Sequence, residues 1–368
     1  MSKDIFDKPF DEGTIAKLEI FENYLDSWLP TLILSKIKKP IQIFDLFAGA
    51  GYDKIGVEGS PMRTLRIIRK HAPKLRHTNN KVCLYLNDFD EDKILTLAKE
   101  CKRKILEYKL EDVIILNVTV YSFIEFLRKN KSKMNYGCNL IFIDQNGFKE
   151  VTEKVFNHLI NIETSEFIFF ISSSVLHRFA QDTEIQKFHP KFDFRIIRTC
   201  DRKIIHNVIC REFEKYVPQN IKSFSLIPFS IMKSDKNNVY GLIFVSKHIR
   251  GADKFLDVVW KKNLINGNAN FDIDEDIKKA QGSLFDGKSL TKIESFQNKL
   301  GNYILIEKQK DNFDVFVFTL NEGHIPKHAY DKLIEMKKNK IIYFDGKSPL
   351  INYKSIFKDK RIIKFKVL

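Results

Sequence analysis

Short apolar runs alternate with amphipathic stretches over the first half of the chain. The apolar runs are Ile41–Phe47, Val82–Leu86, Val113–Val118, Asn139–Ile143 and Glu166–Ile171. Apolar residues recur at helical spacing between them, from Ser60 to about Lys70, from Lys93 to about Lys109, from Ser122 to Lys129, and after Phe148 to about Ile162. Strands that alternate with helices in this way predict a mostly parallel, doubly wound α/β sheet of the Rossmann type.

Two later apolar runs follow each other without a helix. Ser223–Met232 and Val239–Val245 are joined by the polar stretch Lys233–Asn238, a pattern that predicts an antiparallel hairpin closing the sheet. Residues 175–218 break the alternation, and we expect a charged helical insertion over the active face. Because a helix is also expected from Thr14 to Leu34, residues 1–40 are predicted to form a helical lead on a core domain of residues 41–262.

A change of composition marks a second domain. Residues 263–270 are rich in asparagine and glycine and are the expected linker. The remaining residues, 271–368, predict two or three short helices, a strand at Val315–Phe318, a helix from Pro326 to about Lys338, and strands at Ile341–Phe344 and Arg361–Val367. Helices followed by strand, turn and strand predict a small α+β winged-helix domain whose wing is Asp345–Tyr353.

The charge of the chain is strongly positive. The net charge is +15 and the isoelectric point is about 9.3. A field of this sign attracts polyanions, so nucleic acid is the first partner to consider, with DNA favoured over RNA because of the winged helix. The residues expected to contact it are Lys327, Lys332, Lys337, Lys338 and Lys347. The alternative is a lysine-rich helix that faces solvent in a module used for protein contacts.

Cysteine usage and hydropathy narrow the class of protein. The five cysteines form no C-x-x-C pair, which favours reduced thiols in the cytoplasm over a disulfide framework or a zinc site. The N-terminus has no apolar stretch typical of a signal peptide, and no run is long enough to span a membrane. The histidines are scattered, so no metal site is expected.

The first apolar run ends in a glycine turn. The residues Asp45-x-Phe47-x-Gly49-x-Gly51 fit the D-x-F-x-G-x-G turn that class I methyltransferases use for S-adenosylmethionine. Glycine tolerates positive φ and lets a ligand approach the backbone, at the carboxyl edge where open α/β sheets bind ligands. The cofactor-binding residues expected here are Asp45, Phe47, Ala48, Gly49, Gly51, Ser60 and Pro61, with Ser60 also expected to cap the next helix. The alternative is a glycine turn that binds nothing.

Polar residues also follow the other strands. Asp88 and Asp90 come after the second strand, where Rossmann-like domains hold a ribose hydroxyl, although Asp90 can equally cap the following helix. Asn117 is expected at the end of the third strand, facing an adenine ring.

The turn after the fourth strand is the expected catalytic loop. Asp144, Asn146 and Phe148 stand where amino-methyltransferases carry (D/N)-P-P-(Y/F): the first two could accept hydrogen bonds from a base amino group, and the third could stack on an extruded base. The alternative places Asp144 as a strand-end cap and Phe148 in the core.

Together these motifs resemble the three-Cys-motif partner (TcmP) family. The resemblance rests on Asp45-Leu46-Phe47-Ala48-Gly49, on Gly59-Ser60-Pro61, on Asp88-x-Asp90, on Asp144-x-x-Gly147 and on Ser246-Lys247 with Arg250-Gly251. Gln145-Asn146 replace the family's Pro-Phe. The resemblance implies a class I methyltransferase fold, S-adenosylmethionine as cofactor, and a three-cysteine-motif partner protein of the phage Gp37/Gp68-like type.

Two functions from different classes are compatible with the sequence. The first is a methyltransferase that acts on nucleic acid, with a base amino group as acceptor and the winged helix positioning the substrate. The second is a non-catalytic nucleic-acid-binding or scaffold subunit that keeps a vestigial cofactor pocket. Binding of S-adenosylmethionine separates the two hypotheses in part, and methyl transfer separates them fully.

Overall fold

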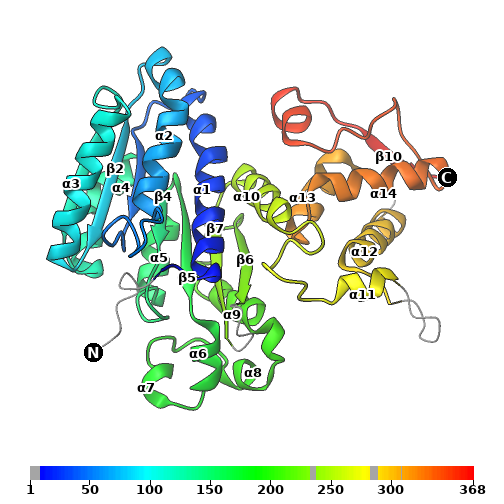
Figure 1. Cartoon of the computed structure of the whole chain (residues 1–368). Helices are drawn as coiled ribbons and strands as arrows, with labels where there is room; N and C mark the ends of the chain where they lie inside the picture. Colours follow the sequence, from blue (N-terminus) through cyan, green and yellow to red (C-terminus); the bar gives the residue numbers. More distant parts are fainter. Residues whose placement is uncertain (1–8, 233–237, 282–288, 308) are drawn as a thin grey trace. The chain divides into compact units, whose positions relative to one another are not determined.

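The five apolar runs of the first half and the two runs of the later hairpin pair into one seven-stranded sheet, in the order β3-β2-β1-β4-β5-β7-β6 (Figure 1). A computed structural model describes residues 9–232, 238–281, 289–307 and 309–368. The strands are β1 (Ile41–Asp45), β2 (Val82–Asp88), β3 (Ile114–Val120), β4 (Cys138–Ile143), β5 (Ser165–Ile171), β6 (Ser225–Met232) and β7 (Val239–Ser246). β1 to β5 are parallel, and β7 is antiparallel to both β5 and β6.

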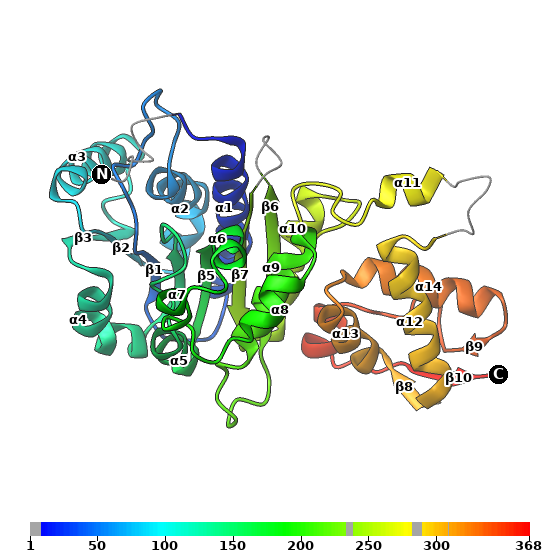
Figure 2. The same ribbon diagram turned by 90° about the horizontal axis from the view of Figure 1, so that it is seen from below.

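Helices cover both faces of this sheet (Figure 2). One face carries α1 (Glu12–Ile33), α2 (Ser60–His77) and α3 (Glu91–Glu107). The other carries α4 (Phe123–Tyr136), α5 (Glu153–Asn161) and α9 (Ile205–Glu214). This arrangement, with its closing antiparallel hairpin, is the class I methyltransferase fold predicted from the pattern. The hairpin turn expected at 233–238 falls outside the described residues except for Asn238.

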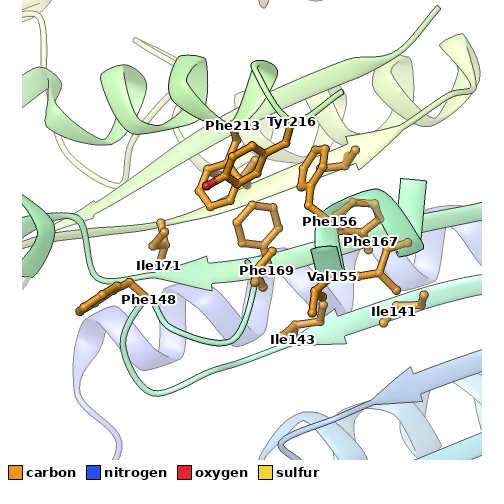
Figure 3. Packing of buried hydrophobic residues seen from close by; sticks show 14 of the residues in the cluster. Ile141, Ile143, Phe148, Val155, Phe156, Phe167, Phe169, Ile171, Phe213 and Tyr216 are labelled. Carbon is orange, nitrogen blue, oxygen red and sulfur yellow. The ribbon is translucent and has the colours of Figure 1, made fainter. Parts of the chain in front are cut away.

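The connection from β5 to β6 contains four α-helices and one 3₁₀ helix. They are α6 (Ser173–Arg178), α7 (Thr183–Gln186), α8 (Phe194–Thr199), the 3₁₀ helix η2 (Arg202–Ile204) and α9. α9 packs on β6 and β7, so the alternation of strand and helix continues through the region expected as an insertion. Figure 3 shows the resulting aromatic core: the Phe213 ring of α9 lies 4.9 Å from Phe169 of β5 and 5.8 Å from Phe156 of α5, between ring centroids.

Two helix boundaries differ from the predicted ones. α2 continues to His77 with Pro73 inside it, instead of ending near Lys70. Its N-cap is Gly59, and Ser60 is already the first helical residue, so the expectation that Ser60 caps this helix is wrong. The first turn of α2 therefore has no side-chain cap.

The second unit contains the predicted winged helix. Contacts divide the chain into Met1–Lys247 and His248–Leu368, a division that falls before α10 (Ile249–Lys262) and not at 263–270. α10 contacts α13 within this unit, and the Trp260 indole N–H donates to the Gly323 carbonyl at 2.9 Å. The remaining elements are α11 (Asp276–Gln281), α12 (Lys292–Glu307), β8 (Gln309–Asp311), α13 (Asn312–Asn321), α14 (Pro326–Lys338), β9 (Ile342–Tyr343), the π-helical turn η3 (Lys354–Lys358) and β10 (Lys364–Val367).

The order of these elements identifies the winged-helix parts. The small sheet has the order β8-β10-β9, so β8 precedes the helix pair α13–α14 and the wing connects β9 to β10. The strand predicted at Val315–Phe318 is wrong, because these residues lie inside α13. A capping box between Asp311 and Asp314 starts this helix. The box fixes the helix start despite the β-branched and aromatic residues that follow.

Candidate functional site

Three carboxylates follow neighbouring strands at the carboxyl edge of the large sheet. Asp88 ends β2, Asp45 ends β1 and Asp144 follows β4, and these strands are adjacent in the sheet. The strand order reverses between β1 and β4, which is the position where open α/β sheets bind their ligands. The predicted site residues with the strongest chemistry are therefore brought to one place by the sheet topology.

The glycine turn after β1 is held by backbone hydrogen bonds to β2. The Ala48 N–H donates to the Asn87 carbonyl at 2.9 Å, and the Gly49 N–H donates to Asp88 Oδ2 at 3.0 Å. Gly49 has a φ of +59° and Gly51 a φ of +91°. These bonds place an acidic side chain of β2 directly against the turn of β1.

Gly51 allows two helices to pack closely on the turn and does not open space for a ligand. A Cβ at this position would lie 3.0 Å from Leu97 Cδ1 and 3.0 Å from Met62 Cε, because the helices α3 and α2 close over it. The space next to Gly51 is thus filled by side chains of the protein. The expectation that both glycines open the backbone to a cofactor is corrected at Gly51.

Asp45 is a buried carboxylate without hydrogen-bond partners. Its side chain is 0% exposed, and among the described residues no group forms a hydrogen bond with either carboxylate oxygen. Burial raises its pKa to about 7; the nearby Ser60 hydroxyl and Phe47 backbone N–H oppose this shift, and the charges of Asp144 and Asp88 add to it. Buried polar groups in proteins are nearly always satisfied, so an orphaned carboxyl at a strand end is a mark of a binding site.

The two aspartates after β2 have different roles. Asp88 accepts from Gly49 N through Oδ2 and from Asp90 N through Oδ1, at 3.0 and 3.1 Å, and is buried. Asp90 is the N-cap of α3, and its Oδ1 accepts from the Lys93 N–H at 3.2 Å. The capping alternative thus accounts for Asp90. Between the two lies Phe89, an aromatic side chain 74% exposed that the sequence analysis missed.

The other predicted cofactor residues are only partly brought together. Ser60 and Pro61 are buried at the start of α2, and the Phe47 ring packs against Phe123 with centroids 5.4 Å apart. Asn117 lies three residues before the end of β3, on an edge strand, and its side chain reaches back to the Ile115 carbonyl. Its predicted place at the strand end is wrong because β3 continues to Val120. At the actual end of β3, the Thr119 hydroxyl and the Tyr121 N–H donate to Asn87 Oδ1 of the neighbouring strand β2.

The loop after β4 is built mainly from internal contacts. Gln145 is 1% exposed; its amide donates to the Phe170 carbonyl at 2.8 Å and its Oε1 accepts from Glu150 N at 2.8 Å. Phe148 is buried in the core cluster of Figure 3, and the His189 ring bonds its carbonyl at 2.9 Å. The prediction that Phe148 stacks on a base is therefore wrong. Asn146 is exposed.

Asp144 is bound by a lysine from α1. Lys17 Nζ donates to Asp144 Oδ1 at 2.6 Å, and the lysine side chain is 9% exposed. The same ammonium lies 4.7 Å from the centroid of the Phe170 ring. The contact was not predicted, although the sequence carries a signal for it: Lys17, Phe21, Tyr24 and Trp28 follow helical spacing, and a lysine within a buried apolar stripe needs a partner.

The lysines predicted to contact nucleic acid fall into two groups. Lys327, Lys338 and Lys347 are exposed. Lys332 pairs with Glu335 at 3.0 Å, and Lys337 donates to the carbonyls of Phe344 and Gly346 at 2.8 and 2.7 Å. The two partnered lysines of α14 are thus bound within the unit.

Comparison with known proteins identifies a family for part of the second unit. Residues 270–349 match the GMT-like wHTH domain family. No curated protein matches the chain. Weak structural likenesses include the human methyltransferase 10 domain containing protein, with a TM-score of 0.28, 11% identity and coverage of 63% of this chain and 83% of that chain. The methyltransferase domain of bacterial CtHen1-C has a TM-score of 0.29 and 12% identity, with coverage of 61% of this chain and 97% of that chain. A SAM dependent methyltransferase from Aquifex aeolicus has a TM-score of 0.28 and 11% identity, with coverage of 64% of this chain and 98% of that chain. At these scores the fold assignment rests on the sheet order itself.

Three further observations concern metal binding, membrane spans and cavities. The described residues contain no group of three or more His, Cys, Asp or Glu that could hold a metal ion. None of the described helices is both long and apolar enough to cross a membrane. The second unit has a cavity of about 290 Å³, but its charged lining is largely paired internally, for example Lys299 with Glu322 at 2.9 Å.

Proposed function

We propose that the chain is a methyltransferase that uses S-adenosylmethionine and acts on nucleic acid. The observation that carries this proposal is Asp45, a fully buried carboxyl without partners at the switch point of the sheet, next to Asp88. A buried carboxyl in such a position favours a ligand that brings positive charge and hydrogen-bond donors, because such a ligand stabilises the ionised form of the carboxyl. S-adenosylmethionine brings an ammonium group, a sulfonium group and ribose hydroxyls.

The residues of the glycine corner fit this cofactor. Asp45 would hold the positively charged methionine part, and Asp88 would accept from the ribose hydroxyls. Gly49 gives the close approach, while Phe47, Ala48, Gly51, Ser60 and Pro61 shape the corner. Asp90 remains a proposed contact at its edge, beside its role as the N-cap of α3, and the exposed Phe89 is suited to stack on the adenine. The bound cofactor supplies an electrophilic methyl group on sulfur.

The acceptor side of the proposal rests on Asp144 and Asn146. Both contain oxygens that can accept a hydrogen bond from an exocyclic base amine, which orients the nitrogen toward the methyl group. The Lys17 ammonium fixes the Asp144 carboxylate by a 2.6 Å contact and thereby limits the directions in which it can move. The second unit would hold the nucleic acid, DNA rather than RNA, through its winged helix.

A binding and a transfer experiment test this function. Titration calorimetry should show binding of S-adenosylmethionine to the wild type and a loss of at least tenfold in affinity for Asp88→Asn. Radiolabelled methyl transfer to duplex DNA, single-stranded DNA and RNA should then give counts that depend on Asp144. Absence of cofactor binding at high micromolar concentration would refute the proposal.

A specific observation favours a non-catalytic scaffold as the second candidate. Asp144 is held by Lys17, Gln145 bonds the backbone on two sides and Phe148 is buried, so much of the loop serves the fold. In that case the protein would bind nucleic acid, and the cofactor if retained, without transferring a methyl group. Binding with no transfer to any of the three substrates would support the scaffold.

The resemblance to the TcmP family adds a partner to the proposal. We propose that a three-cysteine-motif protein of the Gp37/Gp68-like type binds this chain in the cytoplasm, in line with the five free cysteines. Co-expression with such a protein, followed by purification through a tag on this chain, tests the pair. Recovery of this chain alone would contradict it.

A further inference from the structure

The exposed positive charge of the second unit is concentrated after the helix pair and not on α14. From Lys354 to Lys366 the chain has six basic residues and one acidic residue. The basic residues are Lys354, Lys358, Lys360, Arg361, Lys364 and Lys366, named here the wing patch. All six are exposed, and none has an ion pair or a side-chain hydrogen bond with residues that the structure describes.

The strand β10 presents its lysines on one face. Phe365 is 1% exposed, while Lys364 and Lys366 on either side are exposed, so the pleat sends both ammonium groups to the outer face of the small sheet. Lys366 pairs with Tyr343 of β9, which is also exposed. Residues two apart on a strand stand about 7 Å apart, so the two charges form a row along β10, the middle strand of the small sheet.

The helix α14 has fewer exposed lysines without partners than the wing patch. Of its four lysines, Lys332 is paired with Glu335, and Lys337 is bound by two carbonyls at the start of the wing. Only Lys327 and Lys338 remain exposed without partners among the described residues, and the exposed Asp331 lies between them. The contacts of Lys337 show a different role, since they hold the connection after β9 against the end of α14.

We propose that the wing patch binds the phosphate backbone of nucleic acid and is the main electrostatic contact of this unit, ahead of the lysines of α14. The inference rests on the proposed function, which supplies nucleic acid as partner, and it assigns the contact to residues that the sequence analysis did not name. Six unpaired cations can neutralise up to six phosphates, which corresponds to a slope of about −5 in log K against log salt. α14 then contributes position or base contacts and little charge.

A pair of matched double variants of the full chain tests this assignment. Lys364→Gln/Lys366→Gln and Lys327→Gln/Lys338→Gln each remove two exposed positive charges. Fluorescence anisotropy on a labelled 20-base-pair DNA is measured from 50 to 300 mM salt. The β10 variant should lose roughly 10- to 100-fold in affinity at 0.1 M salt, and its salt slope should fall by about 2. The α14 variant should lose less than threefold. Thermal melts check that both variants are folded.

The outcomes separate this inference from the proposed function. Equal losses in the two variants, or a larger loss in the α14 variant, overturn the wing patch while leaving nucleic-acid binding in place. No binding of the wild type to DNA or RNA removes the nucleic-acid part of the proposed function together with the patch. Binding of the wild type to vesicles with anionic lipid, lost in the β10 variant and stronger than binding to DNA, assigns the patch to a membrane and overturns the inference.

Discussion

The glycine corner after β1 and the loop after β4 lie on the same edge of the sheet but differ in how their polar groups are satisfied. In the corner, Asp45 is buried with both oxygens free of hydrogen bonds among the described residues. In the loop, Gln145 and Asp144 are bound by the protein, and Phe148 is in the core. The comparison shows that a binding site is recognised by what the fold leaves unsatisfied, more than by which residue types follow a strand.

The largest effect on stability is expected at Phe148, the buried residue of the loop after β4. Phe148→Ala should destabilise the protein by about 3–5 kcal/mol, because a buried aromatic ring is replaced by a cavity. Urea unfolding followed by circular dichroism measures this loss. The matched variant Asn146→Ala, at an exposed position of the same loop, should change stability by less than about 0.5 kcal/mol. A small effect of Phe148→Ala would return this ring to the set of base-stacking candidates.

The second prediction is a gain in stability when Asp45 is replaced. The pKa of Asp45 is raised by burial to about 7, so its contribution to stability is fully present below the unfolded value of 3.8 and is lost as pH rises toward 7. Asp45→Asn should therefore stabilise the free protein by about 2–4 kcal/mol at pH 8 and by little at pH 4. The same variant should lose binding of S-adenosylmethionine. Retained binding, or a loss of stability at pH 8, would contradict a site held open for a cation.

Acid should destabilise the first unit through two buried histidines: His189, which bonds the Phe148 carbonyl of the β4 loop, and His206 of α9, which bonds the Leu242 carbonyl of β7. Burial lowers the pKa of His189 and of His206 to about 4. A histidine with a lowered pKa contributes stability that is present above its unfolded value of 6.5 and is lost as pH falls toward the folded value. We expect the urea midpoint to fall from pH 6.5 to 4, in the window where Asp45 acts in the opposite direction. The urea midpoint of Asp45→Asn should therefore decline more steeply with falling pH than that of the wild type. Equal slopes for the two proteins would be evidence against opposing contributions from Asp45 and the histidines.

The active-site interpretation of the loop predicts a split between two readouts. Asp144→Ala should lower methyl transfer by roughly 10²-fold, the range of a lost positioned hydrogen-bond acceptor, while cofactor affinity changes less than threefold. Single-turnover transfer and calorimetry on the same preparation measure both. Unchanged transfer would leave Asp144 as a partner of Lys17 with no part in the reaction.

The smallest effect on methyl transfer concerns Lys17 itself. Lys17→Met keeps the apolar stem but leaves the Asp144 carboxylate without the charge that holds it, so stability should fall, by up to the roughly 3–5 kcal/mol lost when a buried ion pair loses one partner. Transfer should fall less than in Asp144→Ala and should recover in part in Lys17→Arg. A loss equal to that of Asp144→Ala, with no recovery in Lys17→Arg, would indicate that Lys17 contacts the substrate instead of positioning the carboxylate.

The sequence by itself determined the sheet strands, the closing hairpin, the glycine turn and the acidic ends of β1 and β2. These follow from local pattern, because a buried parallel strand needs an apolar run and a tight turn needs glycine. It also indicated the winged helix, although the capping box at Asp311 made a helix of the residues expected as a strand. Local chemistry at the start of a helix outweighed β-propensity there.

Only the tertiary structure decided which of the polar residues are free. Lys17 and Asp144 are 127 positions apart, and Lys337 reaches carbonyls beyond the end of its own helix. No periodicity shows that these charges are already partnered, or that Leu97 and Met62 fill the space beside Gly51. The reason is that hydrogen bonding and burial depend on distance in space, whereas a sequence pattern reports only which residues share a strand or a helix face.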